Sequence, residues 1–294
     1  MIELHERLSE FSYGYGVTRE TEILLEETGI RAVPFLPSLI QEKKLGFDVK
    51  FDRPGTALML QFKLGQSLSR FHSSSPVAPR PVLDRPFWRF AIDTAEPDGQ
   101  FETLLKAEDD GAEVYYAAPR FSDWSHYAGF FERREVLNNS VLVRPSEIRA
   151  ALDNQGATDG FHRIVYDRYR VHVCSEPRQI RGTDGDDAIA KVAMIARKRQ
   201  EPVGKLMERL LTGLDDRSSV RRDRPVDVAK AIAEPGIGER ATGEYNRLQR
   251  NRRLASFQEI AKSREQAVAA TVGVELWTLG IQLIVAVDEE TKAV

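Results

Sequence analysis

Three polar residues in one short segment have side chains suited to metal-assisted hydrolysis. Asp48, Gln61 and Lys63 supply a carboxylate, an amide and an ammonium group within residues 47–64. Carboxylate and amide oxygens are hard ligands for divalent cations such as Mg²⁺. A metal ion held in this way polarises a phosphate and activates water, and a nearby ammonium group stabilises the developing charge. This chemistry requires a fold that brings the three side chains together.

The segment that carries them has the pattern of a β-hairpin centred on Pro54 and Gly55. Apolar and polar side chains alternate on both sides of this pair, as in strands with one buried face. Proline presets φ and glycine accepts a positive φ, so the pair predicts a turn. Asp48 would then face Gln61, with Lys63 two positions along the same face. Facing Cβ atoms lie about 5 Å apart, close enough for one cation to contact both side chains.

This arrangement resembles the PD-(D/E)XK nuclease superfamily, in the variant that has glutamine in place of the second acid. Asp48 matches the aspartate of one strand, and Gln61-Phe62-Lys63 matches the acid-x-lysine of the neighbouring strand. Glu42 is similar to the glutamate that many members carry on the preceding helix. The resemblance implies that Asp48, Gln61 and Glu42 bind Mg²⁺ or Mn²⁺ and act in catalysis with Lys63. It also implies phosphodiester hydrolysis, with DNA as the favoured substrate and anti-phage defence as the role.

Other interpretations of these residues remain open. An amide oxygen binds a metal without adding charge, so Gln61 should lower the metal affinity, and a module that kept the fold but lost catalysis is the main alternative. Such a module would bind nucleic acid or a protein partner. A surface hairpin with a merely polar outer face is a further alternative. Glu20 or Glu26 could also replace Glu42 as the ligand on a helix, although acidic residues on a helix commonly face solvent.

The remaining pattern predicts a mixed α/β fold, and the resemblance, which spans roughly residues 18–145, implies an αβββαβ core with a restriction-endonuclease-like central mixed sheet flanked by helices. We expect helices at 2–12, 18–28, 38–45, 100–107, 122–137, 226–234 and 244–271, with further helical spacing between 186 and 213. We expect strands at 88–92, 113–119, 140–143, within 161–173 and at 281–287. The last of these should return the helical C-terminal half to a sheet. We therefore divide the chain into a nuclease-like core, 1–183, and a mainly helical region, 184–294, which could pack on the core as one domain.

Composition excludes several classes of protein. The chain has 294 residues, a net charge of −3 and 41% hydrophobic residues, which is typical of a soluble globular protein. Cys174 is the only cysteine, so an internal disulfide and a multi-cysteine zinc site are excluded. We expect a reducing, cytoplasmic location and no membrane association, because the sequence has neither a leader pattern nor a long apolar run. A GxxxxGK[ST] motif for nucleotide binding is also missing.

Basic residues gather in the C-terminal half and predict contact with phosphates. Arg250, Arg252 and Arg253 belong to a region, 191–253, that is richer in basic than in acidic residues, and Arg70 lies in a predicted long loop after Lys63 that is rich in serine and proline. We expect these four arginines to bind nucleic acid, although arginines on helices often only face solvent. We also expect a protein partner or activator, and assembly as a homo-oligomer.

A few other residues invite chemical roles. His162 and His172 alternate with apolar neighbours, which favours a structural role over metal binding. Cys174 ends an apolar strand, which favours burial over nucleophilic reactivity. Gln100 opens a predicted helix and could contact the substrate or support the site, or it could simply cap that helix.

Overall fold

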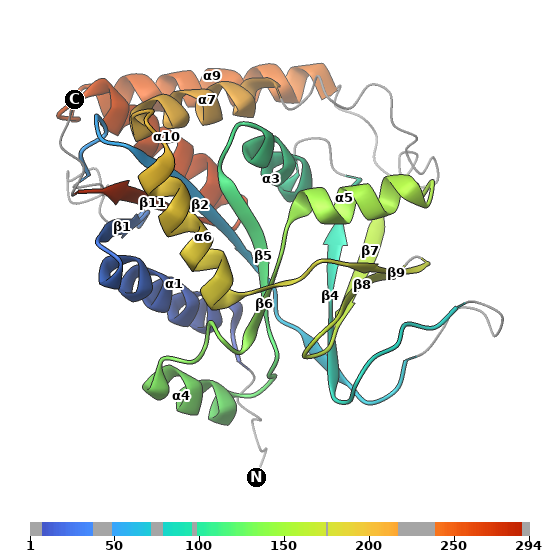
Figure 1. Cartoon of the computed structure of the whole chain (residues 1–294). Helices are drawn as coiled ribbons and strands as arrows, with labels where there is room; N and C mark the ends of the chain where they lie inside the picture. The colour runs from blue at the N-terminus through green and yellow to red at the C-terminus, as the bar shows by residue number, and fades with distance from the viewer. Residues whose placement is uncertain are drawn as a thin grey trace, which may run out of the picture.

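The computed structural model of the chain describes residues 8–37, 49–71, 79–95, 99–174, 176–216 and 239–289. Two β-sheets share an apolar core, and helices cover both faces of the larger sheet (Figure 1). The larger sheet contains strands from both ends of the chain. The predicted mixed α/β fold, with a C-terminal strand that returns to the sheet, is confirmed.

The larger sheet is mixed, and its centre is formed by strands that are far apart in the sequence. In spatial order it contains β1 (Ile30–Pro34), β11 (Ile281–Asp288), β2 (Gly55–Phe62), β5 (Glu113–Pro119), β6 (Ser140–Val143) and β10 (Thr183–Asp184). Strands β2 and β5 are parallel, whereas the other neighbouring strands are antiparallel. Every residue of β2, β5 and β11 is buried, as expected for strands that are covered on both faces.

Two layers of helices bury the two faces of β2. Leu58 and Leu60 pack with α1 (Glu10–Glu27) and α6 (Gly185–Lys198) on one face. Ala57 and Met59 pack on the other face with α3 (Gln100–Asp109), α7 (Val203–Asp216) and α10 (Arg264–Thr278). Helix α9 (Glu239–Gln258) packs on α10. A polar side chain on β2 can therefore reach the solvent only at an end of the strand.

The second sheet is antiparallel and packs beside the first. Its spatial order is β3 (Gln66–Leu68), β4 (Phe87–Asp93), β7 (Phe161–Tyr166), β8 (Val171–Cys174) and β9 (Pro177–Ile180). Phe90 and Tyr166 extend from this sheet into the core, where Phe90 stacks on Tyr116 of β5 with ring centroids 6.1 Å apart. The Tyr166 hydroxyl donates to Pro119 O over 2.7 Å. Two further helices, α4 (Trp124–Arg133) and α5 (Pro145–Asn154), flank the strands.

The predicted hairpin about Pro54 and Gly55 is wrong. Residues 49–53 form no strand, and β2 pairs instead with β11 and β5. Gly55 lies in the strand, where an added Cβ would come within 2.4 Å of Ala286 O in β11. The glycine thus permits the close approach of β11 and does not form a turn. Pro54 makes an isolated bridge with Pro202.

The helices near the N-terminus also differ from the prediction. The described chain forms one continuous helix, α1, capped by Ser9, in place of helices at 2–12 and 18–28. Gly14 and Gly16 lie inside this helix because other side chains press on it: a Cβ at Gly14 would come within 2.6 Å of the Phe62 ring. Gly29 ends the helix with a positive φ, as its sequence position predicted.

Other elements were predicted well or missed altogether. The strands near 88–92, 113–119, 140–143 and 281–287, the two strands within 161–173 and the helix that begins at 100 are confirmed. Strand β1 and helix α5 were not predicted. The expected helix 244–271 is two helices, because the chain leaves α9 after Gln258 and Ser263 caps α10. The expected helices 38–45 and 226–234 lie outside the described residues.

The boundary predicted at residue 183 does not separate two sheets. β11, from the C-terminal region, lies between β1 and β2 of the N-terminal region. The two regions also contribute side chains to the same apolar cluster. Among the described residues, no helix is both long and apolar enough to cross a membrane.

The buried position of β11 leads to a stability prediction. Ile284 is fully buried at the centre of this strand, so Ile284→Ala should lower the free energy of unfolding by about 2–5 kcal/mol. Ile260, which is 45% exposed between α9 and α10, provides a matched control, and Ile260→Ala should cost about 0.5 kcal/mol or less. Urea denaturation of both variants measures the difference. Equal losses of stability would contradict a central position for β11.

Candidate active site

Gln61 and Lys63 lie at the carboxyl end of β2, where the covered part of the sheet ends. Gln61 is the second-last residue of the strand and faces Ile281 of β11 on one side and Tyr116 of β5 on the other. Its side chain is almost completely buried, whereas that of Lys63 is half-buried. The backbone N–H of Lys63 still donates to Ala117 O over 2.9 Å. Because side chains alternate along a strand, Gln61 and Lys63 lie on the same side.

A second glutamine, Gln100, joins this pair from the first turn of α3. Its Oε1 accepts a hydrogen bond from Lys63 Nζ over 3.2 Å. Its Nε2 donates a short hydrogen bond to Leu279 O, just before β11 begins. Gln100 therefore connects the end of β2 to the turn between α10 and β11. We define Gln61, Lys63 and Gln100 as the Gln–Lys cluster.

Gly280 lies next to both amides of the Gln–Lys cluster. Its φ of 73° is in the left-handed region, which favours glycine. A Cβ at this position would lie 3.4 Å from Gln100 Nε2 and 4.0 Å from Gln61 Oε1. Any longer side chain would fill the space next to both amides.

Only one of the two polar atoms of the Gln61 amide has a hydrogen-bond partner. Its Nε2 donates to Phe62 O over 3.2 Å, whereas the buried Oε1 has no hydrogen-bond partner. A buried oxygen without a partner costs about 1–3 kcal/mol. An amide oxygen is a suitable ligand for a hard cation.

The charge on Lys63 is held in a partly desolvated place. Burial lowers the pKa of Lys63 below that of an ordinary lysine, and the nearby negative charge of Glu10 raises it in part. Glu10 begins α1, and the Tyr13 ring of this helix packs against Phe62 at the end of β2. Burial also raises the pKa of Glu10, and the positive charge of Lys63 lowers it. The two groups thus favour each other's charged form.

The structure describes only some of the residues predicted for this site. Asp48 and Glu42 lie outside the described residues. The described neighbours of Asp48, Val49 and Lys50, line a small cavity with Val287, which pairs with Gly55 at the amino end of β2. Within the described ranges, no group of three or more His, Cys, Asp or Glu side chains could hold a metal ion.

The acidic residues suggested as replacements for Glu42 have other positions. Glu20 is buried, and its carboxylate accepts hydrogen bonds from the backbone N–H groups of Val136 and Leu137, at 3.0 and 2.7 Å. These bonds fix the chain that follows α4. Glu26 is exposed in the last turn of α1.

The predicted nucleic-acid-binding arginines are divided between buried and exposed positions. Arg250 of α9 is buried and forms an ion pair with Glu275 over 3.5 Å. Arg253 forms a short ion pair with the same carboxylate. Both therefore connect α9 to α10. Arg252, on α9, and Arg70, after β3, are exposed.

The two histidines and the cysteine are buried or half-buried side chains of the second sheet. Burial lowers the pKa values of His162 and His172, which favours their neutral forms. Burial raises the pKa of the Cys174 thiol to about 12, so the reactive thiolate is scarce at neutral pH.

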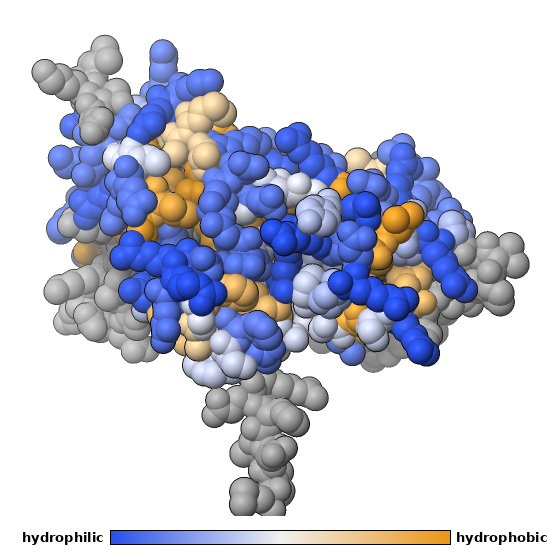
Figure 2. All heavy atoms as spheres, turned by 60° about the horizontal axis from the view of Figure 1, so that its bottom comes forward, coloured by the Kyte–Doolittle hydropathy of each residue, from blue (hydrophilic) through white to orange (hydrophobic). Residues whose placement is uncertain are grey.

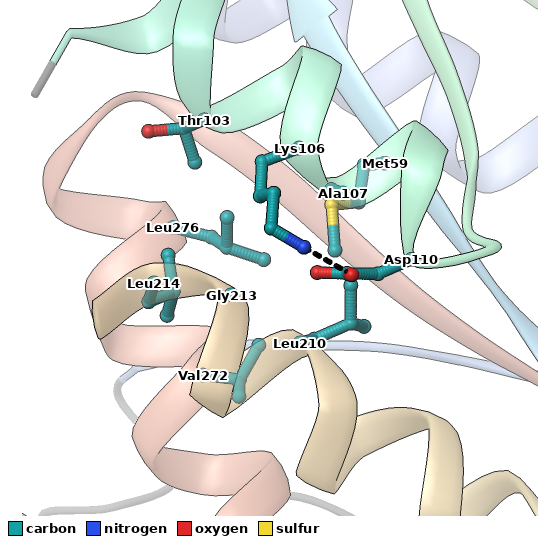
Figure 3. Close-up of a pocket in the computed structure, with 10 residues that line it drawn as sticks. All are labelled: Met59, Thr103, Lys106, Ala107, Asp110, Leu210, Gly213, Leu214, Val272 and Leu276. Atoms are coloured by element: carbon teal, nitrogen blue, oxygen red, sulfur yellow. Dashed lines mark hydrogen bonds and ion pairs between the residues drawn. The ribbon is translucent and has the colours of Figure 1, made fainter. Parts of the chain in front are cut away.

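Below the Gln–Lys cluster, the packing between α3, α7 and α10 leaves almost no space. Figure 3 shows Lys106 and Asp110 of α3 paired among apolar side chains such as Leu210 and Leu276. The cavity there measures about 10 Å³, which is at most the volume of one water molecule. This region therefore contributes to packing.

Sequence reasoning found some parts of this site and missed others. The period-two pattern identified Gln61 and Lys63, and the start of a helix drew attention to Gln100. Glu10 and Gly280 were missed, because both belong to other elements that meet β2 only in the folded chain. A glycine directly before an apolar strand was the one signal that could have indicated Gly280. No protein-family model, curated protein or solved structure matches this chain.

The electrostatic interaction between Glu10 and Lys63 leads to a prediction that is independent of any activity. Glu10→Gln removes the negative charge that raises the pKa of Lys63, so this pKa should fall further below its ordinary value. Glu26→Gln, on the last turn of the same helix, is the matched control and should leave it unchanged. NMR titration of the lysine amino groups, with Lys63→Met to assign the signal, measures the shift. A Lys63 pKa that is identical in both variants would contradict this interaction.

Proposed function

We propose that the protein is a metal-dependent nuclease that hydrolyses phosphodiester bonds at the Gln–Lys cluster. The observation that carries this proposal is the buried, unpartnered Oε1 of Gln61 on the same side of β2 as the Lys63 ammonium. A hard oxygen ligand next to a positive charge suits a phosphate group that is bound by a divalent cation. The position of the cluster at the carboxyl end of β2 would let a polymer reach it.

The order of the elements supports the proposal in part. Along the chain, α1 is followed by β1 and β2, then by β3 and β4 of the second sheet, by α3 and by β5. Strands β2 and β5 are parallel, with α3 between them in the sequence. A helix between two parallel strands is shared with the αβββαβ order that the PD-(D/E)XK resemblance implies, but four described strands precede α3 here, and only β1 and β2 of these belong to the larger sheet. In the sheet, β11 from the C-terminal region lies between β1 and β2.

Among the described residues, Gln61 Oε1 would supply one ligand to a magnesium or manganese ion. The carboxylates that the resemblance implies, Asp48 and Glu42, lie outside the described residues. When bound, the metal supplies an activated water molecule and polarises the scissile phosphate. Gln100 keeps the Lys63 ammonium in place by accepting its hydrogen bond.

Lys63 would stabilise the negative charge that develops on the phosphate. Its partial burial strengthens this interaction, because charges attract more strongly away from bulk water. DNA is the favoured substrate, and a role in defence against foreign DNA follows from the family resemblance alone. The exposed Arg70 and Arg252 are the predicted arginines that remain accessible to a phosphate backbone.

The test is cleavage of plasmid DNA and of labelled RNA with Mg²⁺, compared with the same reactions in EDTA. Lys63→Met should reduce the Mg²⁺-dependent rate about 100-fold or more, as expected for the loss of one charge that stabilises a transition state. Lys198→Met, at the exposed end of α6, is the control and should cleave like the wild type. Purifying the three proteins in parallel accounts for contaminating nucleases.

Equal cleavage by the wild type and Lys63→Met would overturn the proposal. Metal-dependent cleavage that is absent from all three proteins would also overturn it. If nucleic-acid binding persisted in that case, the alternative of a non-catalytic binding module would take its place.

A further inference from the structure

An exposed row of aromatic and cationic side chains lies on α1 and α4. Phe11 is 78% exposed and Tyr15 is 56% exposed, and Arg19 continues the row at the same spacing of four residues. Residues four apart lie on one side of a helix. Phe131 of α4, which is half-buried, packs beside this row. We define the four residues Phe11, Tyr15, Arg19 and Phe131 as the aromatic stripe.

The aromatic stripe is ordered by contacts between its own members. Tyr15 stacks on Phe131 with ring centroids 5.9 Å apart and an angle of 29° between the rings. The guanidinium carbon of Arg19 lies 4.8 Å from the centre of the Phe131 ring. Tyr127 of α4 donates to Ser12 O of α1 over 2.5 Å and so fastens the two helices together. A ligand would therefore meet a preformed surface, which reduces the entropy lost on binding.

The stripe begins on the part of α1 that packs against the end of β2. Phe11 directly follows Glu10, whose charge acts on Lys63. Tyr13, between Phe11 and Tyr15, packs its ring against Phe62 of β2 at 5.8 Å, which fixes this part of α1 to the end of the strand. Figure 1 shows α4 and one end of α1 at the lower end of the molecule. Figure 2 brings this end forward and shows apolar patches set among hydrophilic residues.

Flat rings next to a guanidinium group suit a strand of unpaired bases. Aromatic side chains stack on any exposed base, and an arginine nearby meets the phosphates. A duplex hides the faces of its bases, so these rings could not stack on it. We infer that the aromatic stripe binds single-stranded nucleic acid and leads it to the edge of the sheet where Lys63 lies. The direction of the strand rests on the proposed function, but binding to the stripe does not.

The test is the fluorescence anisotropy of labelled single strands of about 12 nucleotides, within the length that such surfaces cover. EDTA is present, so cleavage does not interfere. Phe11→Ala and Tyr15→Ala should each weaken binding roughly five- to a hundredfold, the usual effect of losing one base stack. Phe161→Ala is the matched control, because Phe161 is also strongly exposed, at 70%, but begins β7 and not α1 or α4. The other end of β7, Tyr166, contacts Pro119. The Phe161→Ala variant should bind like the wild type.

The contribution of Arg19 is measured separately, through the salt dependence of binding. Arg19→Gln should reduce the dependence of log K on log salt concentration by about 0.7, the value for one phosphate contact on a single strand. Arg163→Gln, at an exposed position of β7, should leave this dependence unchanged. Strands of DNA and RNA with the same base sequence are compared, as is the DNA duplex. Thermal unfolding of every variant confirms that the fold is intact.

The outcomes separate this inference from the proposed function. Weakened single-strand binding in folded stripe variants, with the duplex unaffected, supports the inference even if Mg²⁺ produces no cleavage. Wild-type affinity in Phe11→Ala and Tyr15→Ala overturns it even if the protein is an active nuclease. Self-association that depends on these residues, without binding of a single strand, would also overturn it and assign the stripe to a second copy of the chain.

Discussion

The burial of β2 on all sides is the constraint on which the candidate site depends. β11 and β5 satisfy its backbone hydrogen bonds along both edges, and helices cover both faces. Within such a strand, a charged side chain would have to be desolvated at a cost of several kcal/mol. Polar chemistry is therefore confined to the last residues of the strand, and Gln61 and Lys63 are the residues found there. The carboxyl ends of parallel strands are also a common place for ligands in α/β folds.

At this end of β2, the surroundings of Lys63 balance opposing effects. Burial disfavours the ammonium form, whereas the Gln100 hydrogen bond and the negative charge of Glu10 favour it. The result is a cation with few water molecules around it, which acts more strongly on a nearby anion than a fully solvated lysine would. At the same place, the buried Oε1 of Gln61 has no hydrogen-bond partner.

Buried ionic groups hold the elements that support this cluster. Arg149 of α5 forms an ion pair with Asp159 over 2.9 Å, interacts with Glu102 of α3 over 3.4 Å and lies 5.0 Å from the centre of the Phe101 ring. Glu102 and Phe101 directly follow Gln100, so this network fixes the start of α3. Arrangements of this kind contribute modest net stability because of the desolvation cost, but breaking one partner leaves a buried charge. Their effect here is to hold the amide of Gln100 in a fixed position.

Patterns within single elements determined much of the secondary structure and two residues of the candidate site. Alternation placed Gln61 and Lys63 on one side of a strand, and the apolar runs of β5 and β11 were recognised because burial on both faces leaves a clear signal. Only the tertiary structure decided which strand lies next to β2. A strand does not encode its own partner, so a local turn signal at Pro54 and Gly55 gave a hairpin, whereas close packing against β11 is the actual reason for the glycine. For the same reason, Glu10 and Gly280 joined the site only in the fold: residues far apart in the sequence meet because β11 and α1 bury their apolar faces against β2.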